Sequence, residues 1–195
     1  MSAKFIGSVL GVAVTLGGVM QAQEKISRPV VPTNLEVSTD YKLFVKVHAV
    51  GTQNYICAPA ATATGVDWFF IGPQATLFND SLQQAGTHYQ SRNPQRNNAI
   101  QATWQDSGDT SAVWATRRDG SLDANYVAPG AIEWLLLDVT GQQVGPTAGN
   151  KLTPSLLIQR VNTVGGIKPP SVDCTSATLN TRKLVSYEAD YYFYK

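Results

Sequence analysis

The chain ends in the stretch Val185-Ser186-Tyr187-Glu188-Ala189-Asp190-Tyr191-Tyr192-Phe193-Tyr194, whose side chains alternate between two faces. One face carries Val185, Tyr187, Ala189, Tyr191 and Phe193, and the other carries Ser186, Glu188, Asp190, Tyr192 and Tyr194. A period of two residues is the period of a β-strand. A strand so rich in aromatic residues at the end of a chain is predicted to be tied into a sheet.

Shorter strands are predicted upstream of this one. Residues 41–50 place Leu43, Val45, Val47 and Ala49 on one face, before a turn predicted at 51–54. Further strands are expected at 55–57, 65–71, 75–78, 100–104, 111–116, 132–139 and 156–163, with long loops at 87–98 and 141–149. Many short strands separated by Gly, Pro and Asn turns, with almost no helical period, predict an all-β, single-domain antiparallel sandwich or barrel with long loops.

The N-terminus has the pattern of a cleavable secretory signal peptide. Lys4 precedes an apolar run over residues 5–20, and Ala22 marks a plausible cut. The alternative is a membrane anchor, but the run contains four glycines and is shorter than the ~20 residues that a spanning helix needs. We therefore expect a signal peptide at 1–22, an extended lead-in at 23–40 and one secreted β domain at 41–195. Such a protein is extracellular or, in a bacterium, lies in the periplasm or cell envelope, without membrane association after cleavage.

The charge of the chain excludes one class of partner. It has 15 Lys and Arg against 14 Asp and Glu, and the two signs balance once Lys4 is removed. Because it has no basic run, nucleic-acid binding is not expected.

Two cysteines are present, Cys57 and Cys174. In an oxidising compartment an isolated pair most simply forms a disulfide, and two buried free thiols are the alternative. With only His48 and His88 to add, the ligand set is thin, so no metal site is expected.

Several blocks of the chain are similar to a known family. Residues 51–57, 86–89, 158–166 and 187–194 resemble, in order, sequence blocks of the exported bacterial and fungal domain-of-unknown-function 3455 family. The resemblance implies a secreted, compact β domain without settled biochemistry. Some fungal members carry the label malate dehydrogenase. This sequence does not support that activity or any cofactor, since it lacks a Gly-x-Gly-x-x-Gly after a strand and the alternating βα pattern.

His88 is the titratable residue of most interest, because it stands beside a polar segment. With a carboxylate such as Asp106 it would suit general-base catalysis. The alternative is a histidine that bonds to loop backbone, and the chain has no Gly-x-Ser-x-Gly elbow to mark a nucleophile.

The strand at 156–163 carries three polar residues, Gln159, Arg160 and Asn162. Under strict alternation one polar set must face inward, so these side chains are either ligand-binding anchors or a structural ion pair. For a buried arginine, Asp190 or Glu188 is the expected carboxylate partner.

Two further features bear on function. Tryptophans such as Trp104 either stack on sugar rings at the surface or pack in the core. Asn79 begins an Asn-Asp-Ser glycosylation sequon, which is relevant in a eukaryotic host. The sequence thus favours a secreted module that binds a small molecule or glycan. The alternatives are a hydrolase built on His88 and a structural or interaction protein of the cell envelope.

Overall fold

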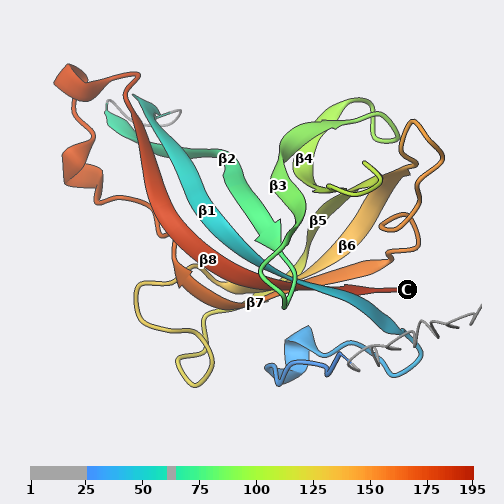
Figure 1. Cartoon of the computed structure of the whole chain (residues 1–195). Helices are drawn as coiled ribbons and strands as arrows, with labels where there is room; N and C mark the ends of the chain where they lie inside the picture. Colours follow the sequence, from blue (N-terminus) through green and yellow to red (C-terminus); the bar gives the residue numbers. More distant parts are fainter. Residues whose placement is uncertain (1–25, 61–64) are drawn as a thin grey trace, which may run out of the picture.

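The last strand pairs with the first and closes the sheet into a barrel. In the computed structural model, which describes residues 26–60 and 65–195, eight antiparallel strands follow one another in sequence order. They are β1 (Leu43–Pro59), β2 (Val66–Phe78), β3 (Gln84–Asn93), β4 (Ala99–Asp106), β5 (Ala112–Ser121), β6 (Trp134–Gln143), β7 (Leu157–Gly165) and β8 (Arg182–Tyr194) (Figure 1). The predicted all-β single domain is therefore confirmed, and its architecture is the barrel. The predicted signal peptide lies outside the described residues.

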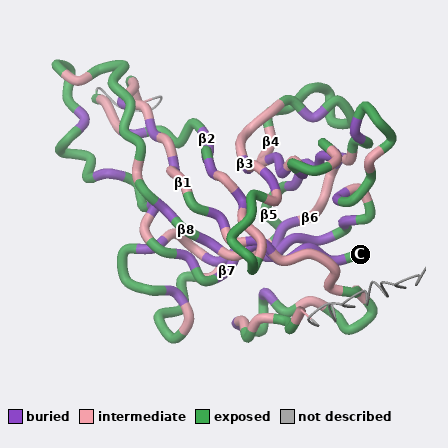
Figure 2. The backbone as a smooth tube through the Cα atoms, in the orientation of Figure 1, coloured by how far each residue is buried: buried purple, intermediate pink, exposed green. Residues whose placement is uncertain are grey.

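The two faces of β8 are buried in different places, and Figure 2 shows the buried residues along the strands. Tyr187, Tyr191 and Phe193 point into the barrel core with residues from most of the other strands. On the opposite face Tyr192 and Tyr194 pack in a second cluster, outside the barrel, with Leu35 of the lead-in. The lead-in carries the short 3-10 helix η1 (Thr33–Leu35). The C-terminal end of β8 is thus covered on both faces, which explains why its outer face also carries aromatic residues there.

Two strands run further than their turn residues predict. The expected turn at 51–54 is part of β1, and the expected break at Gly72 and Pro73 is part of β2. The register shift between the two strands leaves Ile71 without a partner, beside Gly72, which has a positive φ of 126°. Pro73 pairs with β1 but lies before the residues that pair with β3, so its missing N–H disrupts no ladder on the β3 side.

The prediction of a loop at 87–98 is also wrong over most of that range. Residues 84–93 form β3, which pairs with β4 from Gly86 through Asn93. Its inner face carries His88 and Gln90 instead of aliphatic residues, so both faces are polar and the period of two is hidden. Only the residues after Asn93 form the turn into β4.

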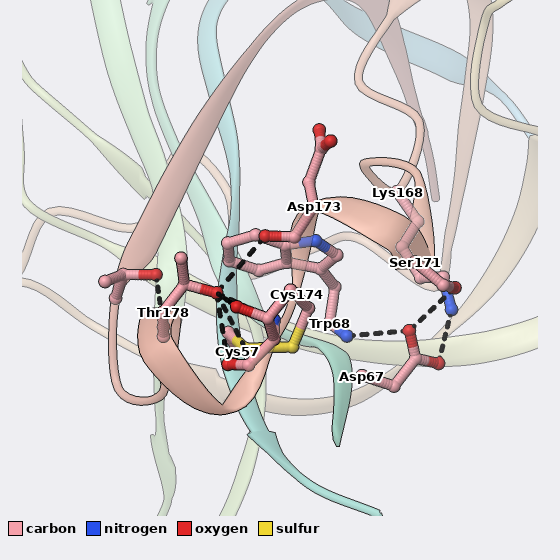
Figure 3. The surroundings of a disulfide bond; sticks show 10 residues. Cys57, Asp67, Trp68, Lys168, Ser171, Asp173, Cys174 and Thr178 are labelled. Carbon is pink, nitrogen blue, oxygen red and sulfur yellow. Dashed lines mark hydrogen bonds and ion pairs between the residues drawn. A yellow bond between two sulfur atoms is a disulfide. The ribbon is translucent and has the colours of Figure 1, made fainter. Parts of the chain in front are cut away.

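The free ends of β1, β2 and β8 project beyond the rest of the barrel (Figure 1). There the predicted disulfide between Cys57 and Cys174 is confirmed, joining β1 to the segment that holds 3-10 helices η2 (Ser171–Asp173) and η3 (Ser176–Thr178). Tyr55 and Trp68 pack around it as a small third core, and Asp67 beside them holds the same segment through Lys168 and Ser171 (Figure 3). Over the described residues, no helix is long and apolar enough to cross a membrane.

Candidate functional site

A cavity of about 140 Å³ lies among side chains from seven of the eight strands. Its apolar wall comes from Phe70, Pro73, Ala102, Leu135 and Leu137, and its aromatic and polar wall from Gln53, His88, Gln90, Trp104, Arg160 and Tyr191. A cavity of this order has room for one ring-sized group. Apolar walls with a few convergent polar groups are the usual makeup of a small-molecule site.

His88 is a buried wall of this cavity. It lies opposite Trp104 in the β3–β4 ladder, and the two rings stack with centroids 4.2 Å apart. Its Nδ1 lies 2.8 Å from the carbonyl oxygen of Thr103. Because a carbonyl oxygen can only accept a hydrogen bond, Nδ1 carries the proton and donates, and Nε2 is left as an acceptor. Burial lowers the pKa of His88 to about 3, and the charge of Arg160 acts in the same direction. His88 is therefore a neutral imidazole at physiological pH.

Two residues of the wall carry buried polar atoms without a hydrogen-bond partner among the described residues. They are the Nε2 of Gln53 and the Nε1 of Trp104. The hydroxyl of Tyr191 lies beside Tyr187 and Arg160, whose side-chain hydrogen bonds act on its pKa. Burial raises the pKa of Tyr191, so its hydroxyl stays protonated. Buried polar groups in folded proteins are nearly always hydrogen-bonded, and such groups call for an explanation. Trp68 and Trp134 have similar unpartnered atoms but do not line this cavity.

Arg160 brings the only formal charge on the cavity wall, since no Asp or Glu lines it. Its Nε and Nη2 donate to the backbone carbonyl of Glu133, at 3.3 and 2.9 Å. The expectation that Asp190 or Glu188 pairs with Arg160 is wrong. Asp190 instead bonds to His48 and Asn162, and Glu188 is on the outer face of β8 with it.

The structure brings three of the predicted binding residues together, His88, Trp104 and Arg160. Gln159 lies on the other face of β7, where its amide donates to the carbonyl of Leu35 and accepts from the Tyr194 hydroxyl. Asn162 is exposed at a bulge of β7, with a positive φ of 52° that favours asparagine. Gln159 therefore holds the lead-in, and Asn162 shapes the bulge.

Asp106 does not line the cavity either. Its carboxylate accepts from the backbone N–H groups of Gly108 and Asp109 and forms an ion pair with Lys151. Among the described residues no hydrogen bond joins it to His88. Its contacts are those of a turn-stabilising aspartate.

The remaining predicted features lie away from the cavity. Trp68, Trp114 and Trp134 are buried, as is Trp104, so none of the four forms an exposed stacking platform. Asn79 lies in the turn between β2 and β3, and its amide donates to Gln83. Residues 26–60 and 65–195 hold no group of three or more metal-ligating side chains.

Sequence patterns do not single out Gln53 and Tyr191 as site residues. Gln53 lies in the stretch expected to turn, and Tyr191 belongs to the apolar face of the C-terminal strand. One signal was present for Gln53: the alternation of Val47 and Ala49, continued through Gly51, places it on the inner face.

Together, the strand order and the cavity define an up-and-down β-barrel with an internal cavity. Residues 37–195 match the family model described as a protein of unknown function (DUF3455), and the chain belongs to that family. Neither the curated proteins nor the solved structures contain a match to it.

Proposed function

We propose that this chain is an exported β-barrel domain that binds a small molecule in its internal cavity. One observation carries the proposal: two buried polar atoms, the Nε2 of Gln53 and the Nε1 of Trp104, lack partners around one cavity. Leaving a buried polar group unsatisfied costs about 1–3 kcal/mol, so a ligand or ordered water that bonds to them offsets a real penalty.

The same wall argues against the hydrolase alternative. A general base needs a pKa near the working pH and a carboxylate or nucleophile within reach. His88 is neutral, its Nδ1 is engaged by Thr103, and no carboxylate lines the cavity. The buried tryptophans likewise give less support to a surface glycan site than to an internal small-molecule site.

Export is supported by the N-terminal sequence pattern and by the disulfide. Cys57 and Cys174 are paired, and such bonds persist in oxidising compartments.

Binding can be tested with a panel of ring-sized compounds that carry a carboxylate, amide, amine or hydroxyl group. The readouts are isothermal titration calorimetry and the shift in melting temperature of the purified protein. Ala102 lines the cavity, so Ala102→Leu should fill it and abolish saturable binding without lowering the stability of the free protein. Ala128, exposed in the β5–β6 connection, gives the matched control Ala128→Leu, which should bind normally. If no compound binds, or if Ala102→Leu binds as well as the original chain, the internal site is refuted.

A further inference from the structure

The charge of the cavity wall points to a class of ligand, an inference that rests on the proposed function. Of the residues that line the cavity, only Arg160 carries a formal charge. Its neighbours His88 and Tyr191 are held neutral by burial. The cavity is therefore electropositive at neutral pH.

That charge has no anionic partner among the described residues. No carboxylate oxygen lies within 4.0 Å of the Arg160 guanidinium, whereas Arg117 and Arg118 on β5 each form an ion pair. The nearby carboxylate of Glu133 pairs with Arg117, and only its backbone carbonyl is turned to Arg160. A carbonyl oxygen accepts hydrogen bonds from the guanidinium but does not neutralise it. Arg160 is thus a half-buried cation in a largely apolar site, an arrangement that ordinarily requires an anion.

The geometry of the guanidinium leaves donors for such an anion. A guanidinium has five N–H donors in a planar fork that matches a carboxylate. The Glu133 carbonyl accepts from Nε and Nη2, and the Tyr191 hydroxyl also hydrogen-bonds to the guanidinium. At least two of the five N–H groups are left for an anion. The fixed position of Nε and Nη2 on a backbone carbonyl also holds the fork in one orientation.

The rest of the wall suits an apolar or aromatic body. Leu135 and Leu137 form one side. The stacked His88 and Trp104 rings form another, together with the Tyr191 ring, whose centroid lies 5.1 Å from that of His88 in an edge-on arrangement. With about 140 Å³ of space, the cavity takes roughly one ring.

We propose that the barrel binds a small organic acid, with its carboxylate paired to Arg160 and its apolar or aromatic body against the Leu135, Leu137 and Trp104 wall. Polar substituents on that body would then donate a hydrogen bond to His88, or accept one from the Gln53 amide or the Tyr191 hydroxyl.

The test compares benzoate with benzamide, which has nearly the same shape but no charge, by isothermal titration calorimetry on the purified protein. Benzoate should bind at least about tenfold more tightly, the factor expected when one charged hydrogen bond is lost. Arg160→Gln should remove the preference, and Arg160→Lys should restore part of it. Arg182→Gln, on the exposed end of β8, is the control and should keep the full preference.

Each result decides between the two proposals. Equal binding of benzoate and benzamide to the original chain overturns the organic-acid proposal and needs no variant. A preference for benzoate that survives in Arg160→Gln also overturns it, provided that circular dichroism shows the variant to be folded. In either case, binding that Ala102→Leu blocks leaves the internal site standing. If no compound of the panel binds, both proposals fail.

Discussion

The imidazole ring of His88 lies almost parallel to the indole of Trp104, with ring centroids 4.2 Å apart and an interplanar angle of 13°. The two residues face each other across the β3–β4 ladder. The carbonyl oxygen of Thr103, the residue before Trp104 on β4, holds the imidazole through its Nδ1. His88 is thereby held as a rigid, uncharged part of the cavity wall.

This arrangement predicts a particular dependence of stability on pH. The pKa of His88 is about 3 in the folded protein against 6.5 in the unfolded chain. Between these values the unfolded state binds the proton and the folded state does not. The free energy of unfolding should therefore fall as pH drops below 6.5, by up to about 1.4 kcal/mol per pH unit from this residue. Urea unfolding at a series of pH values measures the slope.

His88→Asn keeps a donor for Thr103 but cannot titrate, so its slope between pH 6 and 4 should be shallower than that of the original chain. His48 is partly exposed on β1, and His48→Asn should leave the His88 contribution in place. An NMR titration in which the His88 ring protonates near pH 6.5 in the folded protein would contradict this account.

The sequence predicts the elements whose two faces differ in polarity. The alternation from Tyr187 to Phe193 predicts a shared face on a strand within a sheet, and that face lies in the barrel core. The cysteine pair forms as expected. Closure depends on the pairing of β1 with β8, which are far apart in the chain, so local patterns cannot distinguish a barrel from a sandwich. The 87–98 segment misleads because its outer face is polar and its inner face holds His88 and Gln90 instead of large aliphatic residues.

Residue type alone identifies only some of the residues that line the site. His88, Trp104 and Arg160 stand out as residues able to bind ligands, and they meet at one cavity. Gln159 stands out for the same reason, but the lead-in covers the face of β7 on which it lies. The role of a polar residue depends on which face of the strand it lies on and on what packs against that face, and the packing is a property of the tertiary structure.

Gly51 shows why β1 continues where a turn was expected. A methyl group at this position would overlap the carbonyl oxygen of Gln74 and the Cα of Ala75 on the paired strand β2. Gly51→Ala should therefore cost about 1–3 kcal/mol of stability, as forced overpacking typically does. A methyl group at Gly65 meets no described atom within 4 Å. Gly65→Ala should change stability by less than about 0.5 kcal/mol, and equal effects of the two variants in urea unfolding would refute the close approach.

The lead-in is expected to act as part of the folded domain. Leu35 is completely buried against the outer faces of β7 and β8, whereas Val30 in the same segment is 81% exposed. Leu35→Ala should lower the free energy of unfolding by about 2–5 kcal/mol, the usual cost of truncating a core leucine. Val30→Ala should change it by less than about 0.5 kcal/mol. Thermal or urea unfolding would contradict the packing if both variants were equally mild.

The disulfide is expected to contribute strongly to stability because it joins residues 117 positions apart. In the chain-entropy model, closing a loop of this length stabilises the folded state by about 4–5 kcal/mol. Urea unfolding with and without reductant measures the difference, and intact mass under denaturing conditions confirms which form is present. The double variant Cys57→Ala with Cys174→Ala should behave like the reduced protein and be insensitive to reductant. Most of the loss should appear as a lower midpoint for the whole barrel, because Cys57 belongs to β1, which pairs with both β2 and β8. An unchanged midpoint after complete reduction would show that the bond stabilises only the segment around Cys174.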